Sequence, residues 1–107
     1  MVKLIALYRH PEDPAAFDKH YQEVHTPLVE KMPGLKKLEV TRMKGAPTGG
    51  EAKYYLEAAM YFENEESLQA AMNSPEGRAS AKDLMGFAGP LVTMMIGEVA
   101  QVAEIHG

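Results

Sequence analysis

The segment Tyr54-Tyr-Leu-Glu-Ala-Ala-Met-Tyr-Phe62 decides the fold of this chain. It is rich in aromatic residues and contains neither glycine nor proline, a composition that predicts a β-strand. Residues 2–9 form a short apolar run that stops at His10-Pro11, and they predict a second strand. Alternate residues of a strand point to opposite faces, yet both faces of these two strands carry apolar side chains. We therefore expect both faces to be covered.

The rest of the chain alternates between helical and extended segments. Asp13-Pro14 provides an N-cap followed by proline, which predicts a helix that ends near Lys31-Met32, before Pro33-Gly34. Residues 35–44 carry the charges of an edge strand, and residues 45–50 predict the turn of a hairpin. Further helices are predicted over residues 65–73 and 75–87, and a last strand over residues 91–102, with Gly97 as a candidate bulge.

This order, β-α-β-β-α-β, is that of the ferredoxin-like fold, an α+β architecture in which helices cover one face of a four-stranded antiparallel sheet. The first and third strands are expected in the centre and the other two at the edges. The second face of the sheet is also apolar, and the simplest cover for it is an identical subunit related by a two-fold axis. The sequence thus predicts a single domain over residues 1–107 that forms a homodimer.

Composition narrows the class of protein. The 107 residues carry a formal net charge of −4, and no basic cluster is longer than Lys36-Lys37, which argues against nucleic acid or an anionic membrane as a partner. The absence of cysteine excludes disulfides, thiolate nucleophiles and thiolate metal ligands. No stretch approaches the roughly 20 apolar residues of a membrane span, and the N-terminus lacks a signal-peptide pattern. We expect a cytoplasmic protein.

The candidate site lies in the first predicted helix, around His20 and His25. At about 100° per residue, His25 falls on one shoulder of an apolar stripe and His20 on the other. Pro27 removes a backbone donor, so the helix is expected to bend and open a gap beside His25. Histidine titrates near neutral pH, so His25 is a candidate general acid/base; the alternative is a satisfied histidine at the edge of the core. The stripe itself consists of Phe17, Tyr21, Val24 and Leu28.

Other side chains give weaker signals. His20 and His25 lie about 140° apart around an α-helix and do not converge as metal ligands would, so no metal site is predicted. Asp83 could pair with a basic group, although a lone carboxylate is expected to be solvated or to act as a cap. Several methionines and aromatic residues could line an apolar pocket or fill an ordinary core. They are Met60, Met94 and Met95, together with the nearby Ile96, Phe62 and Phe87.

A set of motifs occurs in a fixed order along the chain: the leading strand, Phe17 with His20-Tyr21, His25-x-Pro27-Leu28, Pro33-Gly34-Leu35, the aromatic strand, Asn73-Ser74-Pro75, and Asp83 with Phe87. In these motifs the chain resembles, over nearly its whole length, the EthD-like family. The family implies a dimeric α/β barrel built from two ferredoxin-like subunits, with a ligand cleft between helices and sheet, and its histidine position matches His25.

Relatives of this kind include dehydratases, decarboxylases, isomerases, cyclases and cofactor-independent monooxygenases. The resemblance implies a dehydratase, isomerase or cyclase that uses no cofactor and acts on an apolar or aromatic metabolite, with His25 as general acid/base. The alternatives are a non-catalytic binding or auxiliary protein for an oxidative degradation pathway, and a haem-associated or cofactor-free monooxygenase. The substrate-binding residues expected are Tyr8, Tyr21, Phe62, Phe87 and Met94.

Overall fold

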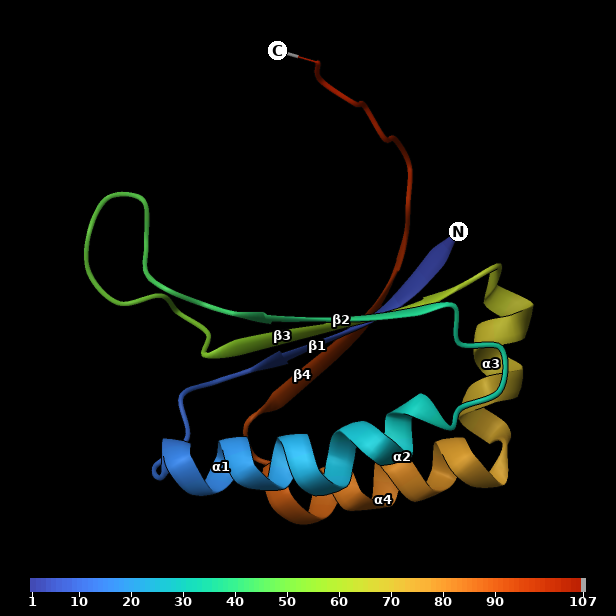
Figure 1. Cartoon of the computed structure of the whole chain (residues 1–107), viewed down its shortest axis with the longest axis horizontal. Coiled ribbons are helices and arrows are strands. Elements are labelled where there is room, and N and C mark those ends of the chain that lie inside the picture. Colours follow the sequence, from blue (N-terminus) through green and yellow to red (C-terminus); the bar gives the residue numbers. More distant parts are fainter. Residues whose placement is uncertain (107) are drawn as a thin grey trace.

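The computed structural model describes residues 1–106 and has the predicted ferredoxin-like, α+β arrangement (Figure 1). Its antiparallel sheet has the strand order β2-β3-β1-β4, so the first and third strands are central, as the sequence predicts. The helices lie on one face of the sheet (Figure 1). The strands are β1 (Val2–Tyr8), β2 (Lys37–Arg42), β3 (Leu56–Phe62) and β4 (Val92–Glu98). The helical segments are α1 (Pro14–His20), η1 (Tyr21–His25), α2 (Thr26–Glu30), α3 (Glu65–Asn73) and α4 (Pro75–Ala88).

The core lies between the helices and the inner face of the two central strands. Leu4 pairs with Met60, Ala6 with Ala58, and Tyr8 with Leu56, so these buried side chains form three rows across the sheet. Each row continues onto β4, where Met94 and Ile96 share the inner face but remain 42% and 45% exposed. The helices therefore cover the centre of this face more completely than the edge at β4.

The first predicted helix contains a π-helical turn. Asp13 caps its start, as predicted, with its carboxylate accepting from the Ala16 N–H at 3.1 Å. Further along, the Thr26 N–H donates to the carbonyl of Tyr21, five residues back. Pro27 follows directly; it has no N–H for the Glu23 carbonyl, and its ring would crowd that carbonyl in a regular α-helix. A widened turn accommodates both effects, and it takes the place of the predicted bend.

The π-turn changes which side chains face the sheet. The prediction that Val24 and Leu28 belong to the inward stripe was wrong: Val24 is 42% exposed and Leu28 only half-buried. A π-turn holds more residues than an α-turn, so the residues that face the sheet across this segment recur every four residues. His25, at 4% exposed, thus lies in the middle of the stripe and not on its shoulder. The buried stripe consists of Phe17, Tyr21, His25, Val29 and Met32.

The last strand is shorter than predicted. β4 ends at Glu98, and Gly97 pairs in register with Lys3, so Gly97 forms no bulge. Residues 99–106 have no regular structure and are largely exposed. They extend away from the sheet on the side opposite the helices, as does the connection between β2 and β3 (Figure 1). Both segments therefore flank the helix-free face.

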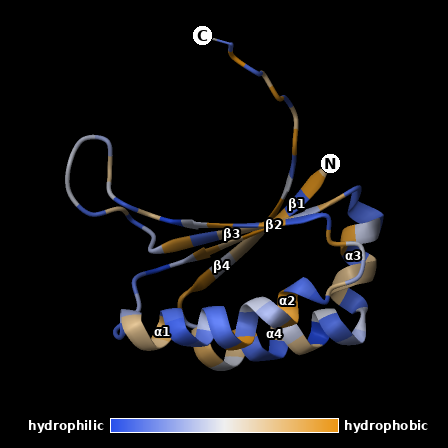
Figure 2. Cartoon of the chain, viewed as in Figure 1, coloured by the Kyte–Doolittle hydropathy of each residue, from blue (hydrophilic) through white to orange (hydrophobic). Residues whose placement is uncertain are grey.

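The outer face of the sheet carries an apolar patch that no helix or strand within residues 1–106 covers. In its central row Ile5 pairs with Ala59 on one side and with Met95 on the other. Leu7 lies in the next row, and Figure 2 shows hydrophobic colouring along these strands. Ile5 and Leu7 are half-buried, while Met95 is 42% exposed. Within residues 1–106, no helix combines the length and hydrophobicity needed to cross a membrane.

Candidate functional site

The π-turn directs His25 inward, toward a carboxylate on α4. Its Nδ1 lies 3.1 Å from Oδ2 of Asp83. An ionised carboxylate only accepts hydrogen bonds, so the Nδ1–H of His25 is the donor and the proton of the neutral imidazole resides on Nδ1. The other ring nitrogen, Nε2, is then left as a hydrogen-bond acceptor. Asp83 thereby fixes both the tautomer and the orientation of the ring.

Nε2 of His25 is available to a ligand. It has no hydrogen-bond partner among the described residues, while every fully buried side-chain polar atom in that part of the chain has one. Nε2 must therefore reach accessible space, although the residue as a whole is only 4% exposed. His25 also lines a cleft between the helices and the sheet. The buried ring can accept a proton at a nitrogen that bulk water scarcely reaches.

Asp83 also holds His20, at the outer end of the same cluster. Nε2 of His20 lies 2.8 Å from Oδ1 of Asp83, while His25 occupies the other oxygen. The expectation of a solvated or capping Asp83 was therefore wrong, because the carboxylate bridges two imidazoles. Side-chain exposure falls along the cluster, from 36% at His20 to 17% at Asp83 and 6% at His25. The cluster thus runs from the surface to the cleft.

Burial sets the protonation of the ionisable groups in the site. Desolvation lowers the pKa of His25, against the opposing effect of the hydrogen bond and charge of Asp83. Desolvation raises the pKa of Tyr21 to about 12, and it also raises the pKa of Tyr8, with a further contribution from the adjacent Tyr21 hydroxyl. At neutral pH the site therefore holds a neutral imidazole beside two protonated hydroxyl groups. Such a set can accept a proton and donate hydrogen bonds at once.

The cleft that His25 lines has a volume of about 100 Å³. Tyr8 and His25 supply its ionisable groups, and the hydroxyl of Ser80 is engaged with the Gly77 carbonyl at 3.2 Å. Much of the remaining wall is thioether. The methionines that line the cleft are Met32, Met60, Met72 and Met94.

The structure brings some of the predicted site residues together and separates others. Tyr8, His25 and Met94 line the cleft. Tyr21 packs between Tyr8 and His25, with ring centroids 5.7 and 5.4 Å away, and supports both rings from outside the cleft. Phe87 lies on the outer side, 4.4 Å from the His20 ring and 5.3 Å from the His25 ring. Phe62 is 0% exposed and belongs to the core, away from the cleft wall.

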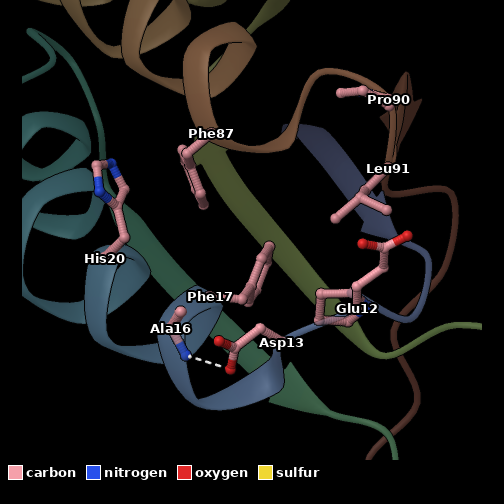
Figure 3. Close-up of a pocket in the computed structure, with 9 residues that line it drawn as sticks. Glu12, Asp13, Ala16, Phe17, His20, Phe87, Pro90 and Leu91 are labelled. Carbon is pink, nitrogen blue, oxygen red and sulfur yellow. Dashed lines mark hydrogen bonds between the residues drawn. The ribbon is translucent and has the colours of Figure 1, made fainter.

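A second hollow lies outside the cluster, beside His20 and Phe87 (Figure 3). This open groove of about 500 Å³ runs between the start of α1 and the turn that follows α4. At its far end lie Glu12 and Asp13, and the Asp13 carboxylate is already engaged as the cap of α1 (Figure 3). His25 does not line the groove, so we assign the candidate site to the inner cleft. Across residues 1–106, no group of three or more His, Asp or Glu side chains is arranged to hold a metal ion.

The buried, neutral His25 makes stability depend on pH. Its pKa in the folded chain lies below the ordinary value of about 6.5, so on acidification the unfolded chain takes up this proton first. The contribution of neutral His25 to the free energy of unfolding is therefore complete above about pH 6.5 and is lost as the pH falls below that value. We expect the melting temperature to fall between pH 7 and pH 5, and His25→Gln to flatten this dependence. The exposed His106 gives a matched control, because His106→Gln should leave the pH dependence of the melting temperature unchanged. The prediction would be contradicted if the melting temperatures of wild type, His25→Gln and His106→Gln fell equally between pH 7 and pH 5.

The fold and the site define a class of protein: a ferredoxin-like α+β subunit with a histidine–carboxylate pair beside a cleft between helices and sheet. Within that class, the EthD domain model matches residues 9–90. The chain belongs to the EthD family.

Three similar proteins place the chain within this family and fold. An EthD family protein from Bacillus halodurans C-125 is 57% identical, with 92% of this chain and 98% of that chain covered and a TM-score of 0.90. A Rhodococcus erythropolis protein described as an uncharacterized 11.0 kDa protein in the thcB-thcC intergenic region is 38% identical over 95 residues, 89% of this chain and 91% of that protein. SnoaB, a cofactor-independent oxygenase from Streptomyces nogalater, shares the fold at 13% identity, with a TM-score of 0.70 and 94% of each chain covered.

Proposed function

We propose that this protein is a small-molecule enzyme that needs no cofactor and acts on an apolar or aromatic metabolite in the inner cleft. The observation that carries the proposal is the arrangement of His25: buried, anchored through Nδ1 to Asp83, and free at Nε2. A histidine so held in the correct tautomer by a carboxylate is suited to general acid–base chemistry.

In this mechanism His25 removes one proton from the substrate and later returns it to a different atom of the substrate. Nε2 takes a proton from a substrate carbon next to a carbonyl or from a phenolic hydroxyl, and the Asp83 carboxylate stabilises the imidazolium that forms, through the Nδ1–H. The Tyr8 hydroxyl is kept protonated by its raised pKa, and it turns its O–H from Tyr21 to the substrate oxygen on which charge develops. The imidazolium then returns the proton, either to another carbon in an isomerisation or to a leaving hydroxyl, which departs as water, in a dehydration.

Turnover without additives is the test of this proposal. Uncharged aromatic and lactone compounds are first screened by thermal shift, and those that stabilise the protein are incubated with it in the absence of any cofactor, with products and dissolved oxygen followed together. Conversion without oxygen uptake supports the proposal. Stabilisation without any product favours a binding or auxiliary role, and conversion that consumes oxygen favours an oxygenase, the activity named for SnoaB.

We further propose that the working form is a homodimer built through the outer face of the sheet. The apolar patch around Ile5 supports this, because an antiparallel sheet with one solvated face carries polar residues there. Two proteins with a ferredoxin-like fold, one from Thermobifida fusca and one from Bacteroides fragilis, are described as dimeric. The two segments that flank this face would reach toward the second copy (Figure 1).

A charge placed in the patch should separate the subunits. We expect Ile5→Lys to shift wild-type dimer to monomer at micromolar concentration in sedimentation equilibrium, because a lysine cannot be buried there without a partner charge. Val24→Lys is the matched control, since Val24 is exposed on the opposite side of the molecule, on the helix. A wild-type protein that sediments as a stable monomer, or an Ile5→Lys variant that stays dimeric, would refute this assembly.

A further inference from the structure

The lining of the inner cleft also specifies a class of ligand. We propose that the cleft selects uncharged compounds with a single ring and one hydroxyl group, of which phenol is the simplest example. The inference rests on the proposed function for what happens to such a compound, but it concerns binding and can be tested separately. Charge, size and the placement of polar groups in the cleft each support it.

The charge of the lining excludes anionic ligands. Neither lysine nor arginine is among the described residues that line the cleft. The Asp83 carboxylate lies directly behind the His25 ring, 3.1 Å from its Nδ1, and its negative charge repels an anion in the cleft. Moving a carboxylate or phosphate from water into such surroundings without a paired cation is strongly unfavourable, whereas burying a neutral ring is favourable. Carboxylates, phosphates and bulky thioesters that carry phosphate groups therefore do not fit this site.

The size of the cleft favours one ring. Its volume is about 100 Å³, while an engineered apolar cavity of about 150 Å³ accommodates benzene. The difference can be supplied by methionine, whose unbranched side chain moves readily and whose sulfur makes favourable contacts with aromatic rings. Met32 and Met60 are each 6% exposed and form the inner wall. Two fused rings would require the wall to move much further.

Three residues that line the cleft are exposed: Met72 near the end of α3, Ala81 on α4 and Met94 on β4. Met72, near the end of α3, is 38% exposed, and Met94, on β4, is 42% exposed, in contrast to the buried inner methionines. Of the exposed lining residues these two have the long side chains, so we expect their size to limit what can enter the cleft. Met85, on α4, is 64% exposed and does not line the cleft, which makes it a matched control.

The two ionisable groups that line the cleft, His25 and Tyr8, favour a ligand that carries a hydroxyl group. Nε2 of His25 is an acceptor with no partner among residues 1–106, and filling the cleft with a purely apolar molecule would leave it desolvated and unpaired. A phenolic O–H satisfies Nε2 directly, and its oxygen can accept from the Tyr8 hydroxyl on the same lining. A hydroxylated ring is thus preferred over the same ring without the hydroxyl.

Calorimetric titration of the full chain with phenol, benzene, benzoate and 1-naphthol tests this inference. We expect phenol to bind at least about tenfold more tightly than benzene, because the hydroxyl pairs with Nε2. Benzoate should bind more weakly still, and 1-naphthol should bind measurably only to Met72→Ala and Met94→Ala, while Met85→Ala behaves like wild type. Benzoate or 1-naphthol binding wild-type protein as tightly as phenol would overturn the inference, as would the absence of phenol binding to wild type and to both enlarged variants.

The results separate this inference from the proposed function. If phenol binds with the expected preference but no compound of its class is converted, the proposed activity fails and the ligand class stands. If conversion is found only for anionic or larger multi-ring compounds, the ligand class fails while acid–base catalysis by His25 stands.

Discussion

His25→Gln is expected to lower kcat for the substrate found in the screen by about 10²–10⁴-fold, the usual contribution of a positioned general acid or base. Glutamine can still donate an amide N–H to Asp83, so the carboxylate keeps a partner and the fold should be retained. It has no group that takes up a proton at neutral pH, so the transfer at Nε2 is lost. The measurement is steady-state turnover beside a circular dichroism spectrum and a melting curve.

A histidine outside the site provides the control for this loss. His10 lies after β1, where its Nε2 contacts the Ala52 carbonyl at 2.7 Å, remote from Asp83. His10→Gln should therefore keep kcat within about twofold of wild type, well inside the smallest loss expected for an acid–base residue. If the folded His25→Gln protein turns over substrate at the wild-type rate, His25 is not the acid–base group and the mechanism proposed for this cleft is wrong.

The architecture could be predicted because it follows from local patterns. Strands such as Leu56–Phe62 combine aromatic and apolar residues without a breaker, and the Asp13-Pro14 pair marks a helix start by its own chemistry. The family assignment rests on the same order of elements. The individual elements follow from residues close together in the sequence, and the strand order and the single helical face could be anticipated because the order of these elements is that of the ferredoxin-like fold.

The position of His25 was harder to predict, because it depends on the phase of one helix. An α-helical projection places His25 on the shoulder of the stripe, whereas the π-turn over Tyr21–His25 carries it to the centre. Pro27 was the signal: it indicated that the regular hydrogen-bond pattern fails just before it. The sequence alone did not show whether the helix would bend or widen, since that choice depends on packing against the sheet.

The role of Asp83 could not be read from spacing at all. It lies 58 residues from His25 and 63 from His20, and only the packing of α4 against the first helix brings the three side chains together. His20 and His25 are five residues apart, the spacing that a π-turn places on one side of a helix. With that turn known, a search for a single carboxylate opposite both histidines would have found Asp83.

The second large effect concerns Phe62, which sequence analysis assigned to the ligand site and the structure places in the core. We expect Phe62→Ala to lower the free energy of unfolding by about 3–5 kcal/mol, because a fully buried aromatic ring is removed and its cavity is filled only in part. Against a total stability of about 5–15 kcal/mol, this is a large fraction. Urea unfolding of both proteins at one fixed concentration measures the difference, since a dimer's apparent stability depends on concentration.

Comparison with Phe87→Ala distinguishes the effect of a core residue from the effect of a residue at the site. Its ring is only half-buried and packs on His20 and His25, so Phe87→Ala should cost less than half the stability lost in Phe62→Ala but should disturb the imidazoles. Ligand affinity of the folded Phe62→Ala protein should stay within about twofold of wild type, because Phe62 does not reach the cleft. A Phe62→Ala variant that has wild-type stability but binds ligand poorly would contradict the assignment of Phe62 to the core. It would show instead that Phe62 lines the cleft, and that the cleft extends further toward α3 than the residues now found to line it.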